Sequence, residues 1–203
     1  TVLIRGSGVD TNVFFPLPEP TGTPLILLPA RLLWDKGVGE FVAAARILKE
    51  KQVQARFILV GDPDSQNPEC IPESKVTEWV NEGVIEAWGF QNNMHEVINQ
   101  AAIICLPSYR EGLPKALLEA ASCGRPIVTN DVPGCREVVL DRKNGFLVPP
   151  KDVTALSTAL ERLIMDKNLR ERMGAEGRRK VIREFSQEII GAETMKVWEE
   201  VQH

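Results

Sequence analysis

Residues 103–120 read IICLPSYREGLPKALLEA, an apolar strand-like run that passes through a tight turn into a helix. Ile103 to Leu106 are consecutive apolar residues, as expected of a strand that is buried on both faces. Lys115 to Ser122 have helical character, and Pro114 is predicted to be the first helical residue, where its missing N–H costs nothing. A buried strand that leads directly into a helix is the building block of a parallel sheet.

The same alternation extends over most of the chain. Further strands are predicted at Leu25–Ala30, Phe57–Val60, Val84–Trp88, Pro126–Thr129 and, as a short last strand, Phe146–Val148. Further helices are predicted at Gly39–Lys51, Met94–Ala101, Cys135–Leu140, Thr154–Met165, Leu169–Glu184 and Gln187–Val201. This order predicts an α/β fold, a doubly wound parallel sheet of Rossmann-like type, with a helical C-terminal tail.

Size and composition narrow the class of protein. A chain of 203 residues with 43% hydrophobic side chains is expected to form one domain. The net charge of −4 argues against a nucleic-acid partner, which requires a basic surface. No apolar run approaches the roughly 20 residues of a membrane span, and no signal peptide opens the chain, so a cytoplasmic location is expected.

Cysteine and histidine content excludes two further kinds of site. The four cysteines show no C-x-x-C spacing and are expected to be reduced thiols. The two histidines, His95 and His203, have no second ligand type nearby, so a zinc site or a Ser-His-Asp triad is hard to build. No metal and no cofactor are expected.

Candidate binding residues are sought beyond the carboxyl ends of the strands, where open parallel sheets bind their ligands. The helix that starts near Lys115 offers free backbone N–H groups and a favourable dipole, which suit a phosphate. Glu111 lies just before this helix and Glu119 inside it, up to ~12 Å apart by helical rise. A nucleotide sugar could span that distance, with one carboxylate on hydroxyls of the hexose and the other on the ribose diol.

A plainer interpretation of the two glutamates stays open at this point. Glu111 would merely favour the helix dipole, and Glu119 would pair with Lys115 on a solvated stripe completed by Ser122. Against this interpretation, the neighbours of Glu119 on the helix are almost all apolar, where an unpartnered carboxylate is costly.

With seven residues between Glu111 and Glu119, the chain resembles the family-4 retaining glycosyltransferases, which have two Rossmann-like domains (the GT-B fold) and a Glu, seven residues, Glu motif. The resemblance extends to residues 132–137 (VPGCRE) and 144–149 (NGFLVP), and capsule and O-antigen transferases look most similar. It implies that residues 1–203 form the C-terminal, nucleotide-sugar-binding domain. The N-terminal acceptor domain is then expected to be absent from this chain, and residues 186–203 to form a helix that returns toward it.

The resemblance also assigns roles to residues. Arg31 and Lys36, in the segment ARLLWDKG at 30–37, match the family's Arg and Lys, which would stabilise the departing diphosphate without a metal. Glu111 would position the hexose, so the expected catalytic residues are Glu111, Arg31 and Lys36. The expected donor-binding residues are Gly8, Arg31, Lys36, Gly89, Phe90, Glu111, Gly112, Leu113, Pro114, Lys115, Ala116, Leu117 and Glu119. Alone, an Arg and a Lys five residues apart are usually surface charges.

Four other features leave alternatives open. Residues 6–11 (GSGVDT) lack the third glycine of a dinucleotide fingerprint, so binding of NAD is not expected. Asp62-Pro63-Asp64 has the D-x-D pattern of metal-dependent transferases but is interpreted as a loop. Phe90 either stacks on the nucleobase or is a core aromatic. The arginines after residue 169 indicate a solvated face, with peripheral contact to anionic lipid at the inner membrane face as the alternative.

The sequence therefore predicts retaining transfer of a hexosyl group from a nucleotide diphosphate sugar, expected to be a UDP-sugar, to a glycan or lipid-linked acceptor. The isolated chain is expected to be inactive because the acceptor domain is missing. A second hypothesis is a non-catalytic nucleotide-sugar-binding or sensor domain, which would not need two cations on the leaving group. A sugar-nucleotide epimerase is a third, which the missing dinucleotide fingerprint disfavours.

Overall fold

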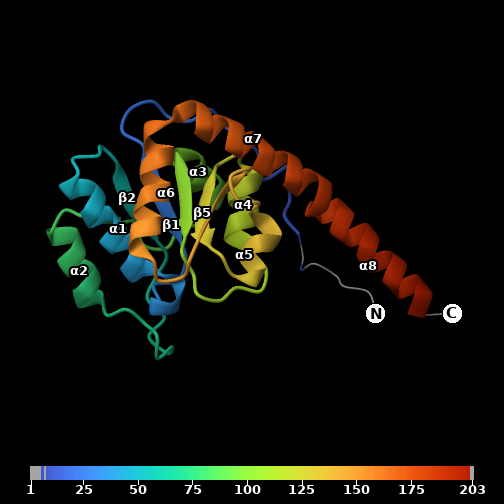
Figure 1. Ribbon diagram of the computed structural model, residues 1–203. Helices are drawn as coiled ribbons and strands as arrows, with labels where there is room; N and C mark the ends of the chain where they lie inside the picture. The colour runs from blue at the N-terminus through green and yellow to red at the C-terminus, as the bar shows by residue number, and fades with distance from the viewer. Residues whose placement is uncertain (1–5, 7, 202–203) are drawn as a thin grey trace.

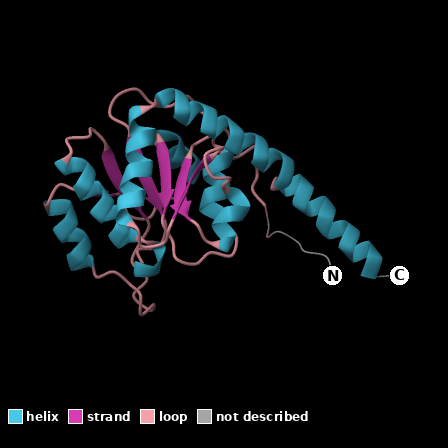
Figure 2. Ribbon diagram, in the orientation of Figure 1, coloured by secondary structure: helices cyan, strands magenta, loops and turns pink. Residues whose placement is uncertain are grey.

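The computed structural model describes residue 6 and residues 8–201, which form a parallel sheet between two layers of helices (Figures 1 and 2). The strands are β1 (Leu25–Pro29), β2 (Arg56–Val60), β3 (Glu86–Ala87), β4 (Ile103–Leu106), β5 (Ile127–Asn130) and β6 (Gly145–Val148). Their order is β3-β2-β1-β4-β5-β6, and every neighbouring pair is parallel. The predicted doubly wound α/β fold is confirmed.

Helices cover both faces of the sheet. They are η1 (Trp34–Lys36), α1 (Val38–Glu50), α2 (Glu73–Asn81), α3 (Met94–Gln100), α4 (Lys115–Ser122), α5 (Pro133–Val138), α6 (Val153–Met165), α7 (Lys167–Glu184) and α8 (Gln187–Val201). Side chains of α1, α2 and α6 share one apolar core with the sheet, and those of α3, α4 and α5 share the other. This is the arrangement that right-handed crossovers produce on the two faces of a parallel sheet.

β1 shows why these residues form a central strand. All five of its side chains are buried, because both faces of the strand are covered. Ile26 and Leu28 point into the core under α1 and α6, whereas Leu25 and Leu27 point into the core under α3 and α4. A continuous apolar run, rather than an alternating one, is the pattern that this environment selects.

Several predicted boundaries need correction. Pro114 is the residue before α4 and not its first helical residue, since its φ of −72° and ψ of 109° are extended. The strand predicted at 84–88 is reduced to Glu86–Ala87 at the sheet edge. α2 was not predicted at all, because in nine residues it buries only Val76 and Trp79, too few for a clear helical period.

α7 and α8 form the predicted helical tail. Figure 1 shows α7 crossing one end of the domain and α8 continuing away from it. Phe185 separates the two helices, and Ser186 pairs with Val9 in an isolated parallel bridge, which ties the start of α8 to the beginning of the described chain. Among the described residues, none of the helices combines the length and the apolar character needed to cross a bilayer.

Candidate functional site

A pocket of about 450 Å³ opens where β1 and β4 lie side by side and the chain leaves them in opposite directions. In a doubly wound sheet this switch point is where ligands bind, because the loops after the two strands separate there. Three loops, after β1, β2 and β3, meet α3 and α4 around the pocket. Its lining residues are Pro29, Ala30, Arg31, Val60, Gly61, Asp62, Pro63, Asp64, Phe90, Gln91, Met94, Ala116 and Glu119.

The loop after β2 positions the cationic wall of this pocket. Arg31 donates from Nη1 to the Asp64 carboxylate at 2.7 Å, and the Leu32 N–H donates to the Asp62 carbonyl at 3.0 Å. The Asp62 carboxylate accepts from the Phe90 N–H at 3.0 Å, so one loop braces its neighbours on both sides. Arg31 remains well exposed, with 61% of its side chain accessible, and can bend toward a ligand.

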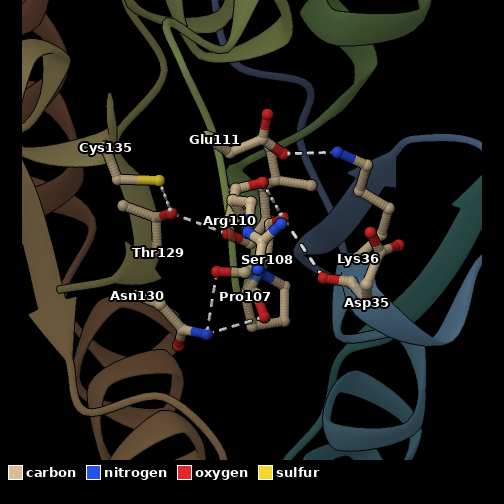
Figure 3. A network of polar contacts seen from close by, with 10 residues as sticks. Asp35, Lys36, Pro107, Ser108, Arg110, Glu111, Thr129, Asn130 and Cys135 are labelled. Carbon is tan, nitrogen blue, oxygen red and sulfur yellow. Dashed lines mark hydrogen bonds and ion pairs between the residues drawn. The ribbon is translucent and has the colours of Figure 1, made fainter. Parts of the chain in front are cut away.

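A second cation is paired with a carboxylate near this edge of the sheet. Lys36 of η1 donates from Nζ to Oε1 of Glu111 at 2.8 Å (Figure 3), and the two side chains are only 17% and 13% exposed. The pair joins the loop after β1 to the loop after β4. Its charge-assisted bond therefore fixes the relative position of two segments that are far apart in the sequence.

Polar side chains of β5 fix the loop that holds Glu111. Asn130 donates from Nδ2 to the carbonyls of Pro107 at 2.7 Å and Ser108 at 3.1 Å, and Thr129 donates from Oγ1 to the Leu106 carbonyl at 2.6 Å (Figure 3). Both side chains are buried. They bond to carbonyl groups at the end of β4 and just after it, and so hold the chain in a single path toward Glu111.

Two glycines allow close approach to this loop. Gly37 has a φ of 74°, and a Cβ there would overlap the Pro107 carbonyl. Gly134 of α5 lies against the carbonyls of Glu111 and Gly112, which an added Cβ would also overlap. Gly134 belongs to the segment VPGCRE, so that motif acts here by supporting the loop around Glu111.

Glu119 forms the acidic wall of the pocket and is only 8% exposed. Burial raises the pKa of its carboxyl, and the nearby Lys115 ammonium, 3.4 Å away, opposes this shift. The ion pair with Lys115 is therefore present as the plainer interpretation supposed. The solvated stripe is not, because Ser122 is fully buried and donates its hydroxyl to the Phe14 carbonyl.

The first turn of α4 reaches the pocket through Ala116. The Leu117 N–H donates to the Pro114 carbonyl at 3.0 Å. The N–H groups of Lys115 and Ala116 come earlier in the helix, where no helical carbonyl is available to accept from them. Glu111 lies outside the helix, which begins at Lys115, so the separation of the two glutamates cannot be taken from helical rise.

The structure places the other predicted residues in several surroundings. Phe90 lines the pocket and is 66% exposed, which rules out the core-aromatic alternative. Leu117 is fully buried in the core, so only its backbone is available to a ligand. Gly89, with a φ of 64°, accepts at its carbonyl from the Gly61 N–H at 3.0 Å. Of the predicted donor-binding set, Arg31, Phe90, Ala116 and Glu119 line the pocket. Its other members near the pocket are not among the lining residues, namely Lys36, Gly89, Glu111, Gly112, Leu113, Pro114, Lys115 and Leu117.

Gly8 packs against the residues at the start of α8 and does not line the pocket. A Cβ at this residue would come within 2.8 Å of the Phe185 carbonyl, and its φ is 69°. The nearby Gly6 is the position that faces the α4 turn, since a Cβ there would lie 3.1 Å from a Leu113 methyl group. The glycine-containing loop thus approaches both the α7–α8 junction and the α4 turn.

Sequence reasoning missed part of the pocket. Asp62, Asp64, Gln91 and Met94 line it, although the two aspartates were interpreted only as a loop. The two aspartates follow the buried strand β2, and this position at the carboxyl end of a parallel strand could have indicated that they lie at the ligand site. Each aspartate has a protein partner, and among residues 6 and 8–201 no cluster of three or more His, Cys, Asp or Glu side chains is arranged to hold a metal. All four cysteines are free thiols.

Comparison with known proteins gives a consistent family. Residues 9–180 match the family model described as "Glycosyl transferases group 1". The chain is 31% identical, over 98% of its length and 54% of the relative's, to the N,N'-diacetylbacillosaminyl-diphospho-undecaprenol alpha-1,3-N-acetylgalactosaminyltransferase of Campylobacter jejuni. It thus spans about half the length of that relative.

Two solved structures share the fold. Sucrose-phosphate synthase of Thermosynechococcus elongatus superposes with a TM-score of 0.85 at 26% identity, over 97% of this chain and 52% of that one. Anabaena HepE, solved in complex with UDP and glucose, gives a TM-score of 0.83 at 20% identity, over 95% of this chain and 55% of that one.

Proposed function

The chain belongs to the group 1 glycosyl transferases, and on that premise we propose that it forms the donor-binding half of a retaining hexosyltransferase. The donor is a nucleotide diphosphate sugar, and we propose a UDP-sugar. The acceptor is a glycan or a lipid-linked glycan, held by a second half of the enzyme. The Campylobacter relative, named for a diphospho-undecaprenol acceptor, and HepE, solved with UDP, support these two assignments.

The observation that supports the proposal best is the pair of opposite charges on one pocket. Arg31 and Glu119 both line it, and Ala116 brings the first turn of α4 to the same wall. A nucleotide diphosphate sugar has a neutral diol and a dianionic diphosphate within one molecule. A buried carboxylate accepts hydrogen bonds from a diol, whereas a guanidinium and free N–H groups suit a diphosphate.

Glu119 is proposed to hold the ribose. Its carboxylate is almost fully buried and can accept two hydrogen bonds from the ribose hydroxyls, which would replace the water that burial has removed. The exposed Phe90 ring on the same pocket would then stack on the nucleobase.

Arg31 and Lys36 are proposed to stabilise the leaving group. The diphosphate gains negative charge as its bond to the anomeric carbon breaks, and fixed cations lower the energy of that state without a metal. The Lys36 ammonium has three donors and uses one on Glu111, so it can keep this partner and still donate to a phosphate oxygen. Arg31 uses one guanidinium N–H on Asp64, and its remaining N–H groups can donate to phosphate oxygens.

Glu111 is proposed to position the hexose. Lys36 and the loop contacts of Asn130 hold it close to the start of α4, where the sugar end of the donor would lie. Its carboxylate would accept hydrogen bonds from hexose hydroxyls and so align the anomeric carbon with the acceptor. No covalent intermediate on this chain is part of the proposal.

Isothermal titration calorimetry of the purified chain with UDP and a panel of UDP-, GDP- and ADP-sugars tests the donor assignment. Binding of a uridine nucleotide, unchanged by a metal chelator, is expected. A folded chain that binds none of these nucleotides at millimolar concentration would contradict the proposal. Little transfer is expected from residues 1–203 alone, because they span about half the length of the Campylobacter relative and the acceptor is proposed to bind to the other half.

A further inference from the structure

A second pocket, of about 390 Å³, lies away from the candidate donor site and shares no lining residue with it. It is bounded by the extended segment before β1, by the turn between α4 and β5, and by residues 170–178 of α7. Its charged lining residues are Glu19, Arg125, Arg170, Glu171 and Arg178. Its volume falls in the range of small-molecule sites, roughly 300–1,000 Å³.

Three arginines from separate turns converge on this pocket. Arg170 uses four of its five N–H donors, two on the Glu19 carboxylate and two on the carbonyls of Leu163 and Ile164. Glu171, the other acidic lining residue, lies 3.7 Å from Lys167. The acidic lining residues are therefore already paired, and they leave Arg125 and Arg178 without a carboxylate among the described residues.

Arg125 and Arg178 instead donate to neutral groups. Arg125 is 4% exposed and bonds through Nη2 to the Leu17 carbonyl and to Asn99, while its buried Nε has no partner. Arg178 bonds to the carbonyls of Thr11, Phe14 and Ser122. Burial lowers the pKa of both guanidinium groups, the expected effect of removing a cation from water, and the nearby Glu19 carboxylate only partly opposes this shift at Arg125.

The magnitudes favour a net positive pocket. The carbonyl end of α4, at Cys123, offsets part of the charge, but a helix end amounts to only about half a unit. Two full guanidinium charges thus leave more than one positive charge here, in a chain whose net charge is −4. Such a site attracts anions, and guanidinium groups suit phosphate geometry in particular.

We propose that this pocket binds a small phosphate-bearing ligand, either free phosphate or a phosphomonoester, between Arg125 and Arg178. Pro16, Pro126 and Ala175 provide apolar walls for the organic part of an ester. The ligand would also bridge the segment at residues 11–19 to α4 and α7, because both arginines already hold the carbonyls of that segment. The segment follows Val9, which pairs with Ser186 at the start of α8.

An NMR titration of the chain with inorganic phosphate, at constant ionic strength, locates the site directly. Amide shifts are expected at Leu17, Cys123 and Gly124. Shifts confined to the donor pocket at residues 61–64 and 115–116, or no shifts, would overturn the proposal. A parallel titration with a hexose phosphate distinguishes the two sources, since tighter binding of the ester identifies a phosphomonoester and equal affinity identifies free phosphate.

Variants test the arginines. Arg178→Gln is expected to lower the affinity for phosphate at least tenfold. Arg172→Gln, on the exposed side of the same helix, should bind phosphate with the affinity of the wild type. Unchanged affinity in Arg178→Gln would overturn the proposal. If Arg178→Gln fails to fold, Arg178→Lys decides, because it keeps the charge but loses the fork geometry. At least threefold weakening is expected there, and unchanged affinity would again contradict the proposed site.

Discussion

Lys36 and Glu111 form an ion pair with an Nζ to Oε1 distance of 2.8 Å, although 75 positions separate them in the sequence. The pair connects η1, which follows β1, with the loop that follows β4. β1 and β4 are the two strands that flank the switch point of the sheet. One residue is proposed to serve the diphosphate and the other the hexose. The two ends of the reacting bond would therefore be positioned by groups that also position each other.

Replacing Lys36 should accordingly affect more than one contact. Lys36→Met removes a cation and leaves a largely buried Glu111 carboxylate without its partner. We expect UDP affinity to fall at least tenfold, the equivalent of about 1.4 kcal/mol. Lys36→Arg, which keeps the charge, should retain part of the affinity. Calorimetric titration of both variants with UDP measures the effect, and wild-type affinity in Lys36→Met would remove Lys36 from the proposed site.

Gly134 allows α5 to contact the carbonyls of Glu111 and Gly112. In Gly134→Ala, the new methyl group should displace this loop and cost about 1–3 kcal/mol of unfolding free energy, as overpacking typically does. Donor affinity should fall with it. Gly191→Ala in α8 is the matched control, because nothing lies within 4 Å of an added Cβ there. Urea unfolding of both variants provides the measurement, and equal stability would show that the loop adapts freely.

The pH dependence of stability should reveal the burial of Glu119. Its pKa is raised in the fold, so the charged form is disfavoured there relative to the unfolded chain. The contribution of this group to stability is complete below the unfolded pKa of about 4.3, and is lost as pH rises through the folded value. Glu119→Gln does not titrate and should gain stability relative to the wild type across that window. Denaturant unfolding from pH 4 to pH 7 tests this, and parallel curves would contradict it.

The sheet was predictable because its central strands are buried on both faces and therefore read as unbroken apolar runs, as at Ile103–Leu106. The two glutamates could be found because one lies in the loop and the other in the helix that directly follow this strand. Partners across loops could not be found in this way. Asp64 pairs with Arg31 across 33 positions, and neither local pattern nor spacing specifies such a contact. The second pocket depends similarly on Arg125, which no sequence pattern singled out, and on Arg178, which belonged to the arginines attributed to a solvated face.

The last prediction separates the roles of Glu111 and Glu119, which are assigned to opposite ends of one ligand. Glu119→Gln keeps the shape of the side chain and removes its charge. It should lower the affinity for the UDP-sugar and for UDP alike, because both contain the ribose. A lost charged hydrogen bond is worth on the order of 1.5–3 kcal/mol, or roughly tenfold or more in affinity.

Glu111→Gln should instead weaken the UDP-sugar and leave UDP nearly unchanged, because only the hexose would reach Glu111. Its ion pair with Lys36 complicates this comparison, since a neutral amide releases the Lys36 ammonium toward the diphosphate. Both ligands contain the diphosphate, so this release acts on both, and the loss that is specific to the UDP-sugar measures the hexose contact. Each variant is titrated with both ligands in a calorimeter. Equal losses for both ligands in both variants would mean that the glutamates only support the fold, through the helix dipole at Glu111 and the Lys115 ion pair at Glu119.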